Sequence, residues 1–109
     1  MLLNVLDATG TSQKVIVKGQ EAVVDHSSTI SVTNTSQIAL TSNALRSGFL
    51  IQNLGTHNMW VNDLGTATET QGSILLVPNA IITGDGYAVN TNAINIIGTA
   101  GDGYTLRSW

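Results

Sequence analysis

The sequence predicts an all-β fold: an antiparallel β-sandwich or a jelly-roll-like barrel with an extended N-terminal segment. Three observations predict it. Val, Ile and Thr are abundant while strong helix formers are sparse, turn residues recur about every ten positions, and several segments alternate between apolar and polar residues. A chain of 109 residues is long enough for one compact core and too short for two.

Ten short segments have the composition and length of β-strands. They are KVIVK (14–18), EAVVDH (21–26), TISVTN (29–34), QIALT (37–41), GFLIQN (48–53), NMWVN (58–62), SILLV (73–77), GYAVN (86–90), AINIIG (93–98) and YTLRSW (104–109). In TISVTN, the alternation predicts that Ile30 and Val32 face the same side of a strand. GFLIQN and SILLV are continuous apolar runs, which favour central strands covered on both faces.

The N-terminal part of the chain differs from the rest. It holds both lysines and the polar loop ATGTSQ, and it lacks the long apolar runs found in residues 48–98. We therefore divide the chain into an N-terminal extension or arm, residues 1–25, and a β-sandwich domain, residues 26–109. The extension is expected to reach a neighbouring subunit by strand addition. The alternative is that it forms two edge strands of the same sandwich.

Charged residues are unusually few. They make up 10% of the chain, against about 25% in an average soluble domain. Ser, Thr and Asn instead account for 33 of the 109 residues and keep the surface hydrated without long-range repulsion between copies. This composition suits a protein packed in a symmetric assembly, and we expect a homo-oligomer, most simply a trimer.

The charge pattern excludes several classes of partner. The net charge is −3, and the four basic residues, Lys14, Lys18, Arg46 and Arg107, form no cluster, which argues against nucleic-acid binding. No apolar run reaches the roughly 18–20 residues of a membrane span, so no membrane partner is expected. The start, MLLNVLDATG, lacks the basic region of a cleaved signal peptide. We therefore expect folding in a cytoplasm, or export by another route.

The tetrapeptide GDGY occurs twice, at Gly84–Tyr87 and at Gly101–Tyr104. A calcium loop needs several converging carboxylates, and each copy supplies one, Asp85 or Asp102. A phosphate-binding loop opens a helix, usually with a lysine, whereas β-pattern follows both copies. Asp-Gly is typical of tight hairpin turns, so we expect two turns, each with its Tyr at the start of the returning strand.

No enzymatic site is expected. The chain has no cysteine, and its two histidines, His26 and His57, lie 31 positions apart, outside any zinc-ligand spacing. Asp25, His26 and Ser27 are adjacent, so their side chains point in different directions and do not form a triad. We expect no catalytic residue, no cofactor and no metal ion. The enzymatic alternative requires a deep pocket lined by His57 or His26 with an acid within hydrogen-bond reach.

Aromatic and arginine side chains are the candidates for contacts with partners, because interfaces favour Trp, Tyr and Arg. The six candidates are Arg46, Trp60, Tyr87, Tyr104, Arg107 and Trp109. Trp60 is opposite in phase to Met59 and Val61. For Trp109, burial under the last strand and burial against another subunit both remain open. Arg46 either pairs with an acid or carbonyl groups of its own chain, or lies at a subunit boundary.

The sequence resembles small virion structural proteins encoded beside the capsid genes of tailed bacteriophages. The resemblance lies in RSGFLIQNLGTHNMWVNDLGTATETQGSILLVPNA, in the closing TLRSW, and in the leading LDATGTSQ and VVDHS. It implies a non-enzymatic β-sandwich that decorates or cements the capsid by bridging shell subunits. The implied partner is the major capsid protein, and the implied location is the virion, assembled in the host cytoplasm. A receptor- or glycan-binding module of a head fibre or tail is the alternative.

Overall fold

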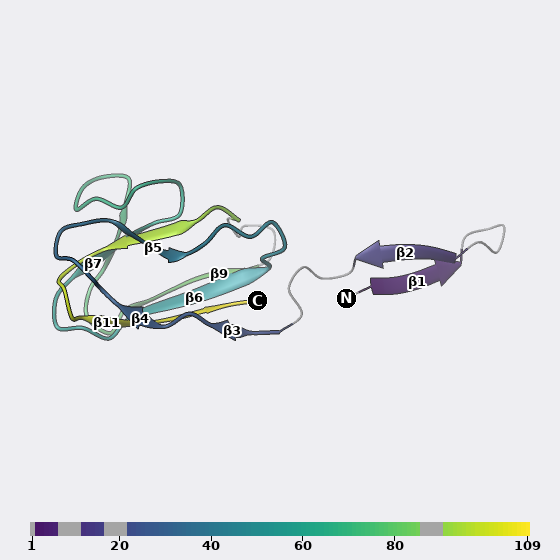
Figure 1. Cartoon of the computed structure of the whole chain (residues 1–109), viewed down its shortest axis with the longest axis horizontal. Coiled ribbons are helices and arrows are strands. Elements are labelled where there is room, and N and C mark those ends of the chain that lie inside the picture. Colours follow the sequence, from purple (N-terminus) through teal and green to yellow (C-terminus); the bar gives the residue numbers. More distant parts are fainter. Residues whose placement is uncertain (1, 7–11, 17–21, 86–90) are drawn as a thin grey trace.

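The structure, a computed structural model, describes residues 2–6, 12–16, 22–85 and 91–109, and it is a β-sandwich (Figure 1). Eleven strands and no helix occur in these ranges. No helix in the described part of the chain is long and apolar enough to cross a membrane. The prediction of an all-β antiparallel sandwich is confirmed.

Two antiparallel sheets make up the sandwich, and all of its strand pairs among the described residues are antiparallel. The first sheet has the order β5 (Gln37–Leu40), β10 (Ile94–Ile97), β7 (Met59–Asn62), β8 (Ile74–Leu76). In the second sheet, β3 (Val24–Asp25) and β4 (Ser28–Thr29) both pair with β11 (Gly103–Ser108), which is followed by β6 (Gly48–Asn53) and β9 (Ile81–Asp85).

Alternating residues of the facing strands fill the core. Met59 and Val61 point inward from β7, while Trp60, opposite in phase as predicted, is only partly buried on the outer face. GFLIQN forms β6, which is internal to its sheet as predicted because β11 and β9 flank it, but its outward residues Leu50 and Gln52 are only half-buried. The core comprises Ile30, Leu40, Phe49, Ile51, Met59, Val61, Leu76, Ile94, Ile96, Tyr104 and Leu106.

Three strand predictions are wrong. SILLV is not a central strand covered on both faces: its residues 74–76 form the edge strand β8, with Ile74 and Leu75 exposed. TISVTN forms a strand only at Thr29, after which the chain turns, so Ile30 is buried while Val32 is 58% exposed. Gly84 and Asp85 end β9 and pair with β6, so these two residues of the first GDGY are strand rather than turn.

The second GDGY also departs from the predicted hairpin turn, because β10 and β11 belong to different sheets and the turn lies before the Asp-Gly pair. Ala100 and Gly101 form the turn, with Gly101 at φ +91°, and Gly103 and Tyr104 begin β11. The predicted strand 86–90 and Tyr87 lie outside the described residues.

The N-terminal strands β1 (Leu2–Leu6) and β2 (Ser12–Ile16) form a separate antiparallel hairpin in which Leu2 pairs with Ile16 and Leu6 with Ser12. Figure 1 shows this hairpin set apart from the sandwich, beyond the end at which β3 and the C-terminus lie. Val24 and Asp25 pair with β11, so the sandwich includes these last two residues of the segment 1–25. The division into two units stays a prediction.

Candidate functional site

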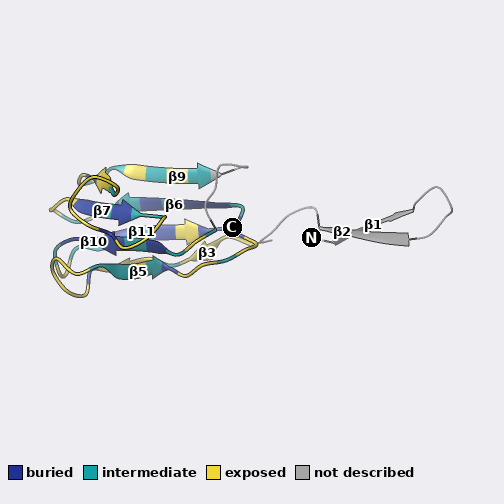
Figure 2. Cartoon of the chain, turned by 90° about the horizontal axis from the view of Figure 1, so that it is seen from above, coloured by how far each residue is buried: buried dark blue, intermediate teal, exposed yellow. Residues whose placement is uncertain are grey.

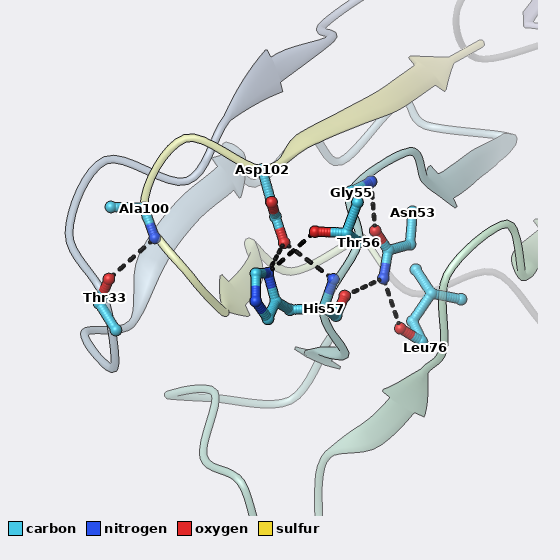
Figure 3. A network of polar contacts seen from close by, with 8 residues as sticks. All are labelled: Thr33, Asn53, Gly55, Thr56, His57, Leu76, Ala100 and Asp102. Carbon is cyan, nitrogen blue, oxygen red and sulfur yellow. Dashed lines mark hydrogen bonds and ion pairs between the residues drawn. The ribbon is translucent and has the colours of Figure 1, made fainter.

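The polar cluster in Figure 3 joins two loops that are far apart in the sequence. Asp102, in the loop before β11, accepts a hydrogen bond from the backbone N–H of His57 at 3.1 Å, and its Oδ2 also lies 3.0 Å from Nδ1 of His57. Thr56 Oγ1 lies 3.2 Å from the same Nδ1. Because a Cβ at Gly55 would lie 2.5 Å from Cβ of Asp102, the carboxylate fits only beside a glycine. The cluster therefore fixes the β6–β7 loop against the β10–β11 loop.

The His57–Asp102 pair sits at the surface. The His57 side chain is 59% exposed and that of Asp102 is 14% exposed. Exposed pairs of this kind contribute little free energy by charge alone, and here the backbone N–H of His57 takes part as well. The contacts of Asp102 tie its own loop to residue 57, which is a structural use of the carboxylate.

A buried asparagine stabilises the same β6–β7 loop from inside the sandwich. Asn53 is fully buried at the end of β6, and its Nδ2 donates to the carbonyl oxygens of His57 and Leu76, both at 2.8 Å. Its Oδ1 accepts from the N–H of Gly55 at 2.8 Å. One side chain thus satisfies three backbone groups and joins β6 to β8 and to the loop that carries His57.

A pocket of about 210 Å³ lies at the other end of the sandwich, where β3, β5 and β11 end. Its lining is Val24, His26, Leu40, Thr41, Asn43, Arg46 and Ser108. His26 Nε2 lies 3.0 Å from Ser108 Oγ. No carboxylate lines this pocket, and the His57–Asp102 pair does not belong to its lining. Among the described residues, the pocket and the histidine–acid pair that the enzymatic alternative requires therefore do not coincide.

Arg46 is buried in the wall of this pocket, with 3% of its surface exposed. Its guanidinium donates from NH1 to the Asn92 carbonyl at 2.9 Å and from NH2 to the Thr41 carbonyl at 2.6 Å. Burial lowers the pKa of Arg46. Arg46 therefore binds carbonyl groups of its own chain, which was the first of the two alternatives for this residue.

Asp25, His26 and Ser27 do not assemble as a triad, as expected. Ser27 Oγ donates to Asp25 Oδ1 at 2.6 Å, the Ser27 backbone N–H donates to the same oxygen at 3.0 Å, and His26 turns toward Ser108 instead. These two hydrogen bonds hold the pKa of Asp25 below its ordinary value. No group of three or more metal-ligating side chains occurs among the described residues.

The structure separates the six candidate contact residues. Tyr104 is 3% exposed and lies in the core, so it offers almost no surface to a partner. Trp60 lies on the outer face of the first sheet, whereas Arg107 and Trp109 lie on the outer face of the second. Tyr87 is outside the described residues, and Arg46 is buried as described above.

Trp109 is fixed against its own chain. Its carbonyl accepts hydrogen bonds from the N–H groups of Ser47 and Gly48, and its own N–H donates to the Gly48 carbonyl at 3.0 Å. A Cβ at Gly48 would overlap the indole ring, so glycine is required under it. The ring is half-buried, which favours intrachain packing for this terminal tryptophan.

An apolar surface that the sequence did not predict runs along one side of the sandwich. It consists of the edge strands β8 and β9 and the turn between them, and we call it the β8–β9 edge. Its exposed aliphatic side chains are Ile74, Leu75, Val77 and Ile81, exposed by 43–53%. The run ILLV was the signal in the sequence that could have indicated this surface. When an apolar run is covered by its own chain on one face only, its other face is left for another molecule.

No protein-family model matches the sequence, and no curated protein matches it. Among solved structures, the chain is similar to one from a structure described as "Bacillus endospore appendages form a novel family of disulfide-linked pili". The two share 15% sequence identity, the match covers 90% of this chain and 95% of that chain, and the TM-score is 0.41. A similarity at this level supports no statement about function, and the fold of this chain rests on its own strand pairing.

Proposed function

We propose that this chain is a non-enzymatic structural protein of a bacteriophage virion, which decorates or cements the capsid by bridging shell subunits. The observation that carries the proposal is the β8–β9 edge. Four aliphatic side chains within eight residues are exposed there on a protein with 10% charged residues. A patch of this kind favours contact with another protein.

The proposed mechanism is mechanical. Covering apolar surface contributes about 25 cal/mol per Å², so each 100 Å² buried at a seam adds about 2.5 kcal/mol. The same contact repeats at every equivalent seam of a shell, and the sum resists rupture. The scarcity of charge keeps the repulsion between neighbouring copies small.

The partners follow from this role. We infer binding to the major capsid protein, assembly of the chain as a homo-oligomer, with a trimer favoured, and a location in the virion. The resemblance of the sequence to small phage virion proteins supports this location, and the use of His57, Asp102 and Arg46 in hydrogen bonds within the chain supports a structural role.

A glycan-binding module is the weaker candidate. Sugar platforms commonly combine neighbouring exposed aromatic rings, and the two tryptophans lie on the outer faces of opposite sheets. They cannot stack on one sugar together. Binding of the isolated protein on a glycan array would favour this candidate over the structural role.

The test is the copy number of the protein in purified virions, measured by quantitative mass spectrometry against the major capsid protein. We expect hundreds of copies in a simple ratio to the shell. About a dozen copies would place the protein in the neck, tail or fibre instead. Absence from the particle would refute the virion role.

A further inference from the structure

Hydrogen bonds bridge the two sheets on both lateral sides of the sandwich, and both sides carry an exposed isoleucine, Ile38 in β5 at 60% and Ile81 in β9. On the β4–β5 side, Gln37 spans the gap between the sheets: its Nε2 donates to the Thr29 carbonyl at 3.1 Å, and its Oε1 accepts from the Ser31 N–H at 2.8 Å. On the opposite side, β9 is the edge of its sheet and Ile81 at its start is 53% exposed. Figure 2 shows exposed positions along β9. An edge strand such as β9, with a free side and an exposed isoleucine, is a template for pairing with another strand.

The hairpin β1–β2 is a strand pair in need of a partner. A two-stranded hairpin alone is at best marginally stable in water. Six of its ten strand residues are apolar, yet it lies apart from the sandwich of its own chain (Figure 1). The structure therefore presents both an edge strand with a free side and a separate apolar hairpin.

The two strands of the hairpin differ in a way that orients it. β1, LLNVL, is apolar at four of five positions, the composition of a strand with neighbours on both sides. β2, SQKVI, is polar at three positions and carries Lys14, and lysine is typical of exposed edge strands. Pairing of β1 with β9 would make β1 an internal strand and leave β2 as the new edge.

Length and charge agree with this pairing. β1 and β9 are both five residues long. Lys14 is the only charged residue of the hairpin strands, whereas residues 22–109 carry five acids and two arginines, a net charge of −3. Residues 2–16 as a whole carry Asp7 and Lys14 and have no net charge, so the hairpin meets the negative sandwich without like-charge repulsion.

We propose that the hairpin β1–β2 of one copy adds to the β8–β9 edge of a second copy, with β1 antiparallel or parallel beside β9. This proposal rests on the structural function inferred above, since it requires an assembly of copies. The contact is heterologous: one copy gives the hairpin and the next gives the edge. A closed ring, of which a trimer is an example, satisfies every hairpin and every edge.

The absence of cysteine from the full chain makes cross-linking a clean test. Two single variants are prepared separately, Asn4→Cys in β1 and Thr83→Cys in β9, where Thr83 is exposed. They are mixed and treated with a bis-maleimide linker long enough to span neighbouring strands. Because each chain has one cysteine, a product that joins residue 4 to residue 83 forms only between two molecules. We expect this heterodimer to dominate over both homodimers.

The matched control moves the acceptor cysteine to the other side of the sandwich. Val32→Cys is similarly exposed, at 58%, in the turn after β4. Mixed with Asn4→Cys it should give at least about tenfold less heterodimer, because a register-specific contact of 1.4 kcal/mol or more separates the two sites. Equal yields from Thr83→Cys and Val32→Cys, or no heterodimer from either, would overturn the proposal.

A second pair of variants tests the edge itself. Ile81→Lys, placed in the Thr83→Cys chain, should reduce the cross-link to Asn4→Cys about tenfold, because lysine on an edge strand opposes strand addition. Val32→Lys in the same background should leave the yield unchanged. Thermal unfolding followed by circular dichroism confirms that both variants fold. An undiminished cross-link in Ile81→Lys would contradict docking at this edge.

The cross-linking result and the copy number in virions together distinguish the docking contact from the virion role. A heterodimer through residues 4 and 83, together with absence from virions, would support the docking contact and refute the virion role. Hundreds of copies in virions, without that heterodimer, would support the virion role and refute the docking contact.

Discussion

At the scale of single residues, glycine positions decide how closely the loops approach. Gly55 lies under Asp102, which holds the backbone N–H and Nδ1 of His57. Gly65, in the loop after β7, has nothing within 4 Å of the Cβ it would carry. The two positions are thus a matched pair for testing whether the His57–Asp102 contact is a fixed part of the structure.

We expect Gly55→Ala to lower the free energy of unfolding by about 1–3 kcal/mol, because its methyl group would overlap the Asp102 side chain. Gly65→Ala should change it by no more than about 0.5–1 kcal/mol, in either direction. Urea denaturation followed by circular dichroism measures both. Equal midpoints for the two variants would mean that the loop carrying Asp102 moves aside freely.

Asp25 gives a prediction about pH. Its folded-state pKa lies below the ordinary value of about 3.9 because Ser27 donates two hydrogen bonds to the carboxylate. The stabilisation from this group is therefore present above the unfolded pKa and is lost as the pH falls through the folded pKa. Asp25 is exposed, so the effect on stability is small and the pKa itself is the better observable.

Ser27→Ala removes the side-chain hydrogen bond, the largest cause of the shift, and leaves the backbone one. We expect the pKa of Asp25 to rise toward its ordinary value, measured by NMR titration of the carboxyl carbon. Ser31→Ala, at another exposed serine, is the control and should leave that pKa unchanged. A Ser27→Ala protein with the pKa of the parent would assign the shift to Arg107 or the backbone instead.

At the scale of elements, one buried amide joins three segments. Asn53 ends β6 and holds the carbonyls of His57 and Leu76 and the N–H of Gly55. β8 is an edge strand of only three residues. The hydrogen bond from Asn53 to the Leu76 carbonyl therefore contributes to holding this strand in place. The geometry of the β8–β9 edge therefore depends on a polar residue in the core.

We expect Asn53→Ala to lower the free energy of unfolding by about 3 kcal/mol, since it leaves buried backbone groups without their partner. Asn58→Ala, at an exposed position five residues later, should cost no more than about 0.5 kcal/mol. Chemical denaturation compares the two. A small loss in Asn53→Ala would mean that water replaces the amide and that this corner is more open than described.

At the scale of the whole molecule, the scarcity of charge sets how copies meet. With a net charge of −3 and an apolar β8–β9 edge, the proposed contact between copies is dominated by burial of apolar surface rather than by ion pairs.

We expect the association constant between copies to change by less than about threefold between 50 mM and 500 mM NaCl, because salt screens mainly exposed charges. Analytical ultracentrifugation at several concentrations measures it. Weakening by tenfold or more over this range would indicate an interface held by charge, and would move the contact away from the β8–β9 edge.

The sequence by itself determined the fold class, the internal place of GFLIQN in a sheet, and the opposite phases of Trp60 and its neighbours Met59 and Val61. Each of these depends on local pattern: β-branched composition, a continuous apolar run, and the two-residue period of a strand. It also indicated that His26 would point away from Asp25 and Ser27, because adjacent side chains of a strand point to opposite faces.

Only the tertiary structure decided which strands lie at the edges and which polar groups meet. An apolar run has the same pattern whether its second face is covered by its own chain or by another molecule, so SILLV could not be recognised as an edge strand from its letters. Asp102 and His57 are 45 residues apart, and no local signal predicts their contact. Strand neighbours are chosen by the packing of the complete sandwich, and that choice placed Tyr104 and Arg46 inside and left the β8–β9 edge uncovered.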